Sequence, residues 1–197
     1  MSKITRSTFD RQYEHIANIR HGVATGPFRI EFPAPVKADE NAAKIFQGSV
    51  VSLDANGEYI AGCPAGSAVN CPVPFISLKN VFDPDVTTGY NSGDNWTKRS
   101  TFSAQGGKIT AIPATAGYEM ETTEFDTTAT YAPNDALVAG TGDNLGKVVK
   151  ATSGLGSESI LGFVSLAPST DEHGNKRLAF FTAFVPAAGA ADESTSN

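Results

Sequence analysis

Residues 121–151, ETTEFDTTATYAPNDALVAGTGDNLGKVVKA, indicate the fold class of this chain of 197 residues. The stretch opens with threonine and aromatic residues, which suit a pleated, half-buried surface better than a helix. A break at 133–135 precedes a short apolar run, 136–139. Residues 140–144 then supply the glycine, aspartate and asparagine that tight turns require, and 145–150 runs back. The pattern predicts a β-hairpin.

A second stretch has the same design. In residues 46–61, FQGSVVSLDANGEYIA, the apolar run 50–53 leads into the turn sequence 54–57, and 58–60 returns. We therefore expect a β-structured body organised around two hairpins. Further apolar runs, separated by turn residues, are typical of strands. They lie at 72–78, 108–112, 118–125, 159–166 and 177–185.

Two of these runs also predict where their strands lie in a sheet. The run 72–78 contains Pro72 and Pro74, and it is expected at a sheet edge because proline cannot donate to a β-ladder. The runs 159–166 and 177–185 are apolar on both faces. They are expected to form a long hairpin at the centre of a barrel or sandwich.

The chain divides into three predicted regions: an N-terminal arm at 1–44, a β-rich body at 45–185, and a small, polar, acidic tail at 186–197 that we expect to be disordered. Its 19 glycines and 11 prolines favour a turn-rich β protein over a helical one. The predicted fold class is mainly β, a small β-barrel or β-sandwich (β-tulip-like) body with an extended N-terminal arm. The sequence leaves open whether the body is one barrel or two small sheets.

The arm has two interpretations. Residues 7–20 fit a short helix or an extended segment, and 28–32 alternates apolar and charged residues as an exposed or edge strand does. Residues 1–30 carry a net charge of +3 against −9 for the rest, which indicates contact with an acidic surface such as another protein chain. Seven apolar side chains are costly to leave in water and are expected to pack along the body or on a neighbouring subunit. They are Ile4, Phe9, Tyr13, Ile16, Phe28, Ile30 and Phe32.

Composition argues against several classes of protein. A net charge of −6 without a basic face is unlike a nucleic-acid-binding protein. No apolar run approaches the length of a membrane span, and the first residues lack the apolar region of a signal peptide, so we expect a cytosolic product. Cys63 and Cys71 lie eight positions apart. A disulfide between them is feasible but is the less common outcome in a reducing cytosol, and the pair lacks the further ligands of a metal site.

No catalytic, cofactor-binding or metal-binding constellation emerges, and the sequence predicts a protein that is not an enzyme. Residues 154–157, GLGS, lack the residue order of a nucleophile elbow. The sequences at 54–57, 142–144 and 171–175 resemble the start of calcium loops without the distant bidentate glutamate, so we expect turns. Four acidic residues fit a solvated strand face better than a glycosidase pair. They are Glu119, Glu121, Glu124 and Asp126.

Three groups of residues resemble the head decoration (cement) proteins of tailed bacteriophages. They are GSVVSLDANGEY at 48–59, APNDAL at 132–137 leading to GKVV at 146–149, and ILGFV at 160–164. The resemblance covers roughly residues 48–185 and implies a small β-barrel or β-tulip-like body. The arm matches in kind, since such proteins often use a terminal arm to clasp neighbours.

The resemblance also implies a structural role. Such a protein binds the outer surface of the mature capsid, bridges neighbouring capsid subunits and stabilises the head against the pressure of packed DNA. The implied partners are the major capsid protein and further copies of the chain, as a homodimer or homotrimer, with no cofactor, nucleic acid or membrane. The protein would be made in the host cytoplasm and reside on the outside of the virion. The arm residues from Ile4 to Phe32 are the expected capsid or intersubunit contacts.

The alternative hypothesis is a phage fibre, baseplate or receptor-binding β module that recognises carbohydrate. It rests on the long polar stretch 83–107, because long loops are often binding sites. In that loop Tyr90 and Trp96 would form a stacking platform for a sugar, with Asp94 and Asn95 as polar partners.

Overall fold

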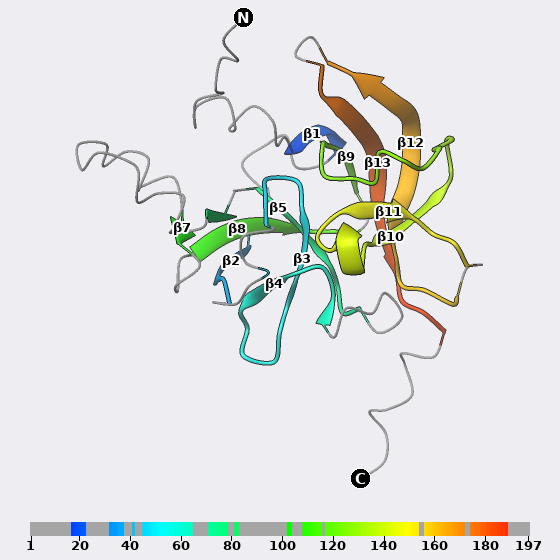
Figure 1. Ribbon diagram of the computed structural model, residues 1–197. Coiled ribbons are helices and arrows are strands. Elements are labelled where there is room, and N and C mark those ends of the chain that lie inside the picture. Colours follow the sequence, from blue (N-terminus) through cyan, green and yellow to red (C-terminus); the bar gives the residue numbers. More distant parts are fainter. Residues whose placement is uncertain are drawn as a thin grey trace, which may run out of the picture.

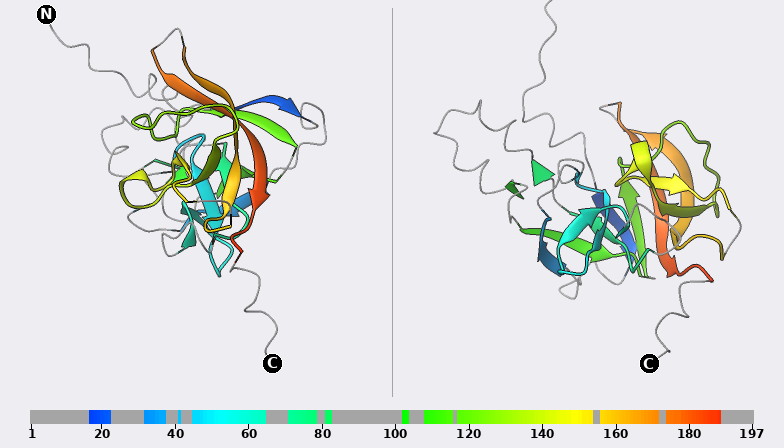
Figure 2. Two further views of the ribbon diagram at one scale, coloured as in Figure 1. Left: turned by 90° about the vertical axis from the view of Figure 1, so that its right-hand side faces the viewer. Right: turned by 60° about the horizontal axis from the view of Figure 1, so that its bottom comes forward.

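The computed structural model describes residues 17–22, 32–37, 41, 45–64, 71–78, 81–82, 102–103, 108–115, 117–153, 156–171 and 174–188. Within these residues the chain is mainly β, as the sequence predicts, with thirteen strands and one 3-10 turn, η4 (Gly142–Asn144). Two antiparallel sheets, of six and five strands, make up the body (Figures 1 and 2). β6 (Val81–Phe82) and β7 (Phe102–Ser103) form a separate parallel pair.

The six-stranded sheet is built around the predicted long hairpin. Its strands, in spatial order, are β1 (Ala17–Gly22), β9 (Tyr118–Thr122), β13 (Lys176–Val185), β12 (Ile160–Thr170), β10 (Ala136–Ala139) and β11 (Val148–Lys150). The β12–β13 hairpin occupies the centre, with Phe163 opposite Phe181 and Val164 opposite Phe180. The hairpin predicted within residues 121–151 is β10–β11, and η4 forms its turn. Both predicted hairpins in this sheet are confirmed.

The five-stranded sheet contains the other predicted hairpin. Its order is β2 (Phe32–Pro35), β8 (Lys108–Pro113), β5 (Phe75–Ser77), β3 (Val50–Leu53) and β4 (Tyr59–Ala61). An isolated bridge joins Val36 to Tyr59, and the Lys37 amide donates to the Tyr59 carbonyl at 3.0 Å. This single bridge links the two ends of the sheet without a regular ladder. The body is thus two sheets rather than a closed barrel.

The edge position predicted for residues 72–78 is wrong. β5 begins only at Phe75, after both prolines, and it pairs with β3 on one side and β8 on the other. Each residue of β5 retains its amide, so the strand can lie inside a sheet. The proline rule instead applies to β2, FPAP, which lies at the edge and pairs only with β8.

The segment predicted to be an arm contributes an edge strand to each sheet. β1 pairs with β9, from Ala17 opposite Thr122, so the helical interpretation of 7–20 is wrong for residues 17–20 and the extended one holds. β2 extends the other sheet, and Phe32 is the only described residue of the strand predicted at 28–32. Residues 1–16 and 23–31 lie outside the described residues. Residues 189–197 of the predicted tail also lie outside the described residues. Ala187, which belongs to the same predicted tail, is buried, and its amide donates to Ser159 Oγ at 3.2 Å.

The main core lies between the two sheets. Val50, Ile76 and Ile112 of the five-stranded sheet pack in one cluster with Met120, Leu178 and Phe180 of the six-stranded sheet. Their chain neighbours Val51, Phe75 and Ala111 point the opposite way, because successive side chains of a strand alternate between faces. These neighbours form a second cluster with Tyr59 and Val36. The five-stranded sheet is therefore buried on both faces.

Candidate functional site

The two hairpins that the sequence singled out touch each other in the fold. The Val50 amide, at the start of β3, donates to the Gly146 carbonyl in the turn region of β10–β11 at 2.8 Å. Gly62 follows β4 and has a φ of +68°, and a Cβ built there would lie 2.7 Å from Leu145 Cδ1. The absence of a side chain at Gly62 lets the hairpins approach closely. This contact holds β10–β11 against the five-stranded sheet.

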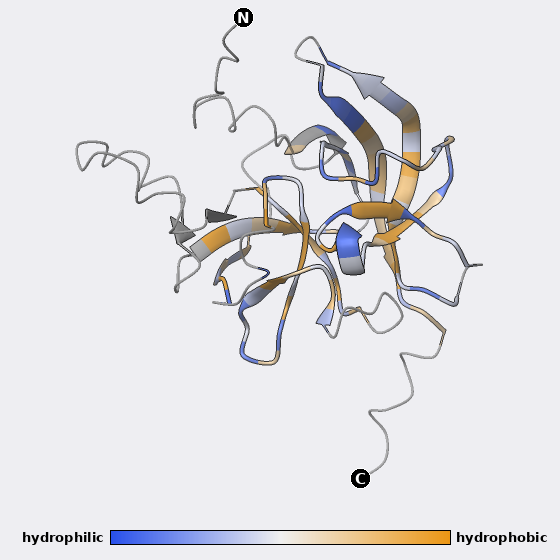
Figure 3. Ribbon diagram, viewed as in Figure 1, coloured by the Kyte–Doolittle hydropathy of each residue, from blue (hydrophilic) through white to orange (hydrophobic). Residues whose placement is uncertain are grey.

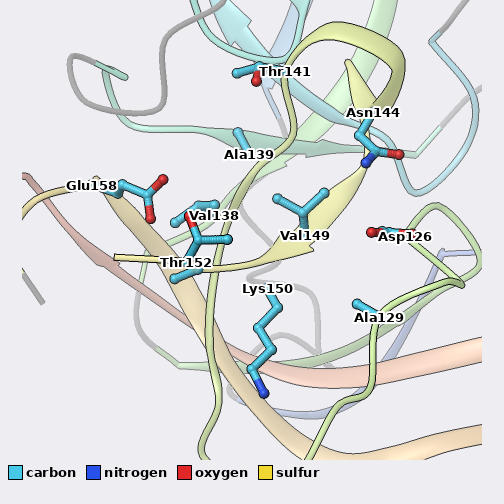
Figure 4. Close-up of a pocket in the computed structure, with 11 residues that line it drawn as sticks. Asp126, Ala129, Val138, Ala139, Thr141, Asn144, Val149, Lys150, Thr152 and Glu158 are labelled. Atoms are coloured by element: carbon cyan, nitrogen blue, oxygen red, sulfur yellow. The ribbon is translucent and has the colours of Figure 1, made fainter. Parts of the chain in front are cut away.

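A groove crosses the β10–β11 hairpin (Figure 4). We call it the hairpin groove, and its volume is about 450 Å³. Its floor includes the cross-strand pair Val138 and Val149, together with Ala129. The walls come from three separate parts of the chain: the loop at 126–129, the turn of the hairpin, and residues 151, 152 and 158, which precede β12. The remaining lining residues are Asp126, Ala139, Thr141, Asn144, Lys150, Ala151, Thr152 and Glu158.

The polar side chains of the groove are divided between its two sides. Figure 4 shows Asp126 and Asn144 on one side of the valine pair, and Thr152 and Glu158 on the other. Lys150 extends away from these groups, because its Nζ lies 2.7 Å from Asp135 Oδ2 and donates to the Thr130 carbonyl at 3.3 Å. The groove therefore has an aliphatic floor, a carboxylate on each side and a lysine that is already ion-paired.

Asp126 is held in its ionised form. Its Oδ1 accepts hydrogen bonds from the Thr128 hydroxyl at 2.6 Å and the Thr128 amide at 2.9 Å. These bonds lower the pKa of Asp126, and the charge of Lys147 lowers it further. Across the groove, Glu158 Oε2 accepts the Ser153 amide at 3.3 Å. Among the described residues, Asp126 Oδ2 and the Asn144 side-chain amide make no hydrogen bond, so both remain available to a ligand.

A second surface lies on the outer side of the six-stranded sheet. We call it the apolar face, and it consists of Phe163, Leu166, Phe181 and Val185. Phe181 is 51% exposed, Leu166 49% and Val185 45%. Phe163 lies directly opposite Phe181 on the neighbouring strand. Figure 3 shows apolar colouring along much of β12 and β13, whereas the ends joined by their turn are hydrophilic.

Charged side chains lie beside the apolar face. Ser165 donates to Glu119 at 2.7 Å, and Arg20 of β1 lies 3.8 Å from the same carboxylate. Arg177 lies 2.7 Å from Asp171 and 3.5 Å from Glu121. The acidic residues of β9 thus belong to ion pairs along the sheet. The interpretation of the four acidic residues as a solvated strand face is wrong for Glu119 and Glu124, which are buried at 7% and 8% exposure.

Most of the sequence-predicted site residues lie outside the described residues. Of the seven expected contact residues only Phe32 is described, and its ring packs edge-on against Phe75 at 5.7 Å while the side chain stays 45% exposed. The other six are Ile4, Phe9, Tyr13, Ile16, Phe28 and Ile30. The four residues of the carbohydrate hypothesis, Tyr90, Asp94, Asn95 and Trp96, lie outside as well. Both sets therefore remain predictions.

The calcium-like sequences form turns, as predicted. Asp54 Oδ1 accepts the amides of Asn56 at 2.8 Å and Glu58 at 3.1 Å, and the Glu58 hydrogen bond is the main reason that the pKa of Asp54 is lowered. Asp171 accepts the Asn175 amide at 2.8 Å in the same way. Within the described part of the chain, no three histidine, cysteine or acidic residues are grouped as a metal site would require.

Cys63 and Cys71 form a disulfide, so the expectation that they stay reduced is wrong. That expectation rested on the redox compartment, whereas the fold brings the two Cα atoms to 5.1 Å. Both cysteines are buried in the core between the sheets. The bond therefore covalently joins the end of β4 to the segment that leads into β5.

Sequence reasoning missed the hairpin groove. The hairpin itself was predicted, but the walls of the groove come from loops outside the hairpin, and sequence periodicity does not indicate which face those loops cover. Comparison with known proteins adds no further guide: no protein-family model matches the chain, and no curated protein matches it. Among the described residues, the structure contains no helix long and apolar enough to cross a membrane.

Proposed function

We propose that the protein is a structural virion protein that binds the outer surface of the mature phage capsid. It bridges neighbouring capsid subunits and stabilises the head against internal DNA pressure, and it acts by binding rather than by catalysis. Its partners are the major capsid protein and further copies of the chain. The proposal is supported by the resemblance of residues 48–185 to cement proteins and by one structural observation, the apolar face.

The apolar face has the composition of a binding surface. Leu166, Phe181 and Val185 expose large apolar side chains on the two central strands, where a soluble β-sheet normally presents polar residues to water. The ion pair between Arg177 and Glu121 and the ion pair between Arg20 and Glu119 lie beside these side chains. An apolar centre with a charged rim is the usual anatomy of a protein–protein interface. We therefore assign the capsid or intersubunit contact to this face as well as to the N-terminal region.

The energetics of this surface fit a bridging role. Full burial of one large apolar side chain contributes about 1.5–3 kcal/mol, and these side chains are already half buried. A single contact is therefore weak once the cost of association is subtracted. Repetition compensates for this weakness, because a symmetric oligomer presents the same surface to several capsid subunits at once. Binding only to the mature shell stabilises that shell by mass action.

Co-sedimentation tests the proposal. The purified protein is mixed with mature and immature capsids of its source particle that have been stripped of their own copies. We expect saturable binding to mature capsids at a fixed ratio to the capsid protein. Absence of binding would refute the capsid role, and a glycan screen with a Trp96→Ala variant would then test the carbohydrate alternative.

Two groups of variants locate the contact. Phe181→Ser with Leu166→Ser should reduce capsid binding at least tenfold, whereas Val73→Ser, at a residue 38% exposed outside the apolar face, should not. Deletion of residues 2–16 tests the N-terminal contact while keeping β1 paired with β9. A deletion through residue 32 would also remove β1 and alter the sheet. If neither the paired substitutions nor the deletion changes binding, the assigned surfaces are wrong even where capsid binding itself persists.

A further inference from the structure

The hairpin groove has a chemistry that specifies one class of ligand. We propose that it binds an aliphatic cation, an alkyl chain that ends in an ammonium or guanidinium group. The alkyl chain would lie on Val138 and Val149, and the cationic end would pair with the carboxylate of Asp126 or Glu158. This inference is independent of the capsid proposal, because the groove lies on β10–β11 and contains no residue of the apolar face.

The charges around the groove favour a cation over an anion. Two of the lining side chains are carboxylates, Asp126 and Glu158, and they lie on opposite sides of the valine pair (Figure 4). Among the described residues that line the groove, Lys150 is the only cation, and it is ion-paired with Asp135 at 2.7 Å and extends away. Lys147 acts on Asp126 through its charge but does not line the groove. An anionic ligand would meet two carboxylates and no available cation.

The floor of the groove favours an aliphatic ligand over a sugar or a flat ring. The apolar lining residues are alanines and valines, and no aromatic side chain from the part of the chain that the structure describes lines the groove. Aromatic rings provide the stacking surface on which planar ligands and sugar faces pack, and this surface is missing. A short methylene chain instead matches the methyl groups of Val149, which is partly exposed, and of Val138, which lines the groove although it is only 2% exposed. The groove volume of about 450 Å³ is large enough for such a chain.

The polar residues complete a site for the cationic end. Asp126 Oδ1 accepts both hydrogen bonds from Thr128, so Oδ2 can accept a hydrogen bond from a ligand. Asn144, on the same side, offers an amide oxygen, so an ammonium group can donate to two acceptors there (Figure 4). A bare metal ion is a poorer match, because the described residues contain no cluster of three ligating side chains.

Such a cation has two sources, a free diamine or a lysine side chain of a partner protein. Titration of the full-length protein, labelled at the valine methyl groups, with cadaverine and with Nα-acetyl-lysine amide distinguishes them by NMR. We expect saturable shifts of the Val138 and Val149 methyl resonances in the millimolar range. Binding of cadaverine alone would assign a diamine that spans both carboxylates, and equal binding of both probes would assign a single lysine side chain.

The controls separate ion pairing from nonspecific effects. 1-Pentanol has the same alkyl chain without charge and should bind at least fivefold more weakly. Glu158→Gln and Asp126→Asn should each weaken cadaverine binding by about threefold to fivefold, the fold-change expected for one exposed ion pair. Asp143→Asn makes the same charge change in the adjacent turn, outside the groove, and should bind as the unaltered protein does. Equal affinity for pentanol, unchanged affinity in both groove variants, or an absence of shifts would each overturn the proposal.

Discussion

At the residue scale, the β10–β11 turn depends on two glycines for different reasons. A Cβ on Gly140 would collide with the backbone oxygen of Asn144, whereas Gly142 has open space around it and a φ of +58°. Gly140→Ala should therefore lower the free energy of unfolding by about 3 kcal/mol or more, since backbone atoms cannot move aside cheaply. Gly142→Ala should cost only about 1–2 kcal/mol, the penalty of a left-handed conformation. Urea denaturation measures both, and equal losses would contradict the steric explanation.

A second residue-scale prediction concerns acid stability. The hydrogen bond from Lys150 lowers the pKa of Asp135 below its usual value of 3.8, and the Ala132 amide adds to the effect. A carboxyl whose pKa is lower in the folded state stabilises the fold at pH values above its unfolded pKa, and this stabilisation is lost as the pH falls through the folded pKa. The free energy of unfolding should therefore decrease below about pH 4.

Asp135→Asn tests this origin of the acid sensitivity. The asparagine keeps an oxygen for the Ala132 amide but removes the charge that pairs with Lys150. The variant should be less stable than the unaltered protein at pH 7, and the difference should shrink toward pH 2. Urea denaturation across this range provides the measurement. A difference that stays constant with pH would show that Asp135 acts without its charge.

At the element scale, the Cys63–Cys71 disulfide fixes β4 relative to the start of β5. Closure of a loop of this length stabilises a fold by about 2–3 kcal/mol in the chain-entropy description. The double variant Cys63→Ala with Cys71→Ala should lose about this much, and reduction of the unaltered protein should have a similar effect. Unfolding is compared with and without dithiothreitol, and the double variant, which has no bond to reduce, is the control. A reductant effect of equal size in the variant would rule out the bond as the cause.

The element scale also shows why some features could be predicted and others could not. The turns at Asp54 and Asp171 are local, since each carboxylate accepts amides within four residues, and so their hairpins could be read from the sequence. The pairing of strands that are distant in the sequence could not be predicted in this way. β5 is internal because β8 returns from a distant part of the chain, and residues 17–22 form a strand because β9 offers an edge. The hairpin groove was unpredictable for the same reason.

At the scale of the whole molecule, a shared core and a buried threonine help to connect the two sheets, in addition to the contact between Val50 and Gly146. The main core contains side chains from both sheets. Thr122, fully buried in β9, donates to the Gly48 carbonyl at 3.0 Å and accepts the Glu124 amide at 2.9 Å. Gly48 lies just before β3 of the other sheet. Neither sheet can therefore unfold without exposing part of the other, and we expect a single cooperative transition.

Thr122→Val tests this connection. Valine has the shape of threonine but no hydroxyl, so the Gly48 carbonyl and the Glu124 amide each lose a partner. The free energy of unfolding should fall by about 1–3 kcal/mol. Thr127→Val, at an exposed position in the following turn, is the matched control and should change it by less than about 0.5 kcal/mol. Within each of the three proteins, the unfolding midpoint measured by far-ultraviolet circular dichroism should equal the midpoint measured by near-ultraviolet circular dichroism. Two separate midpoints would show that the sheets unfold independently, in spite of their common core.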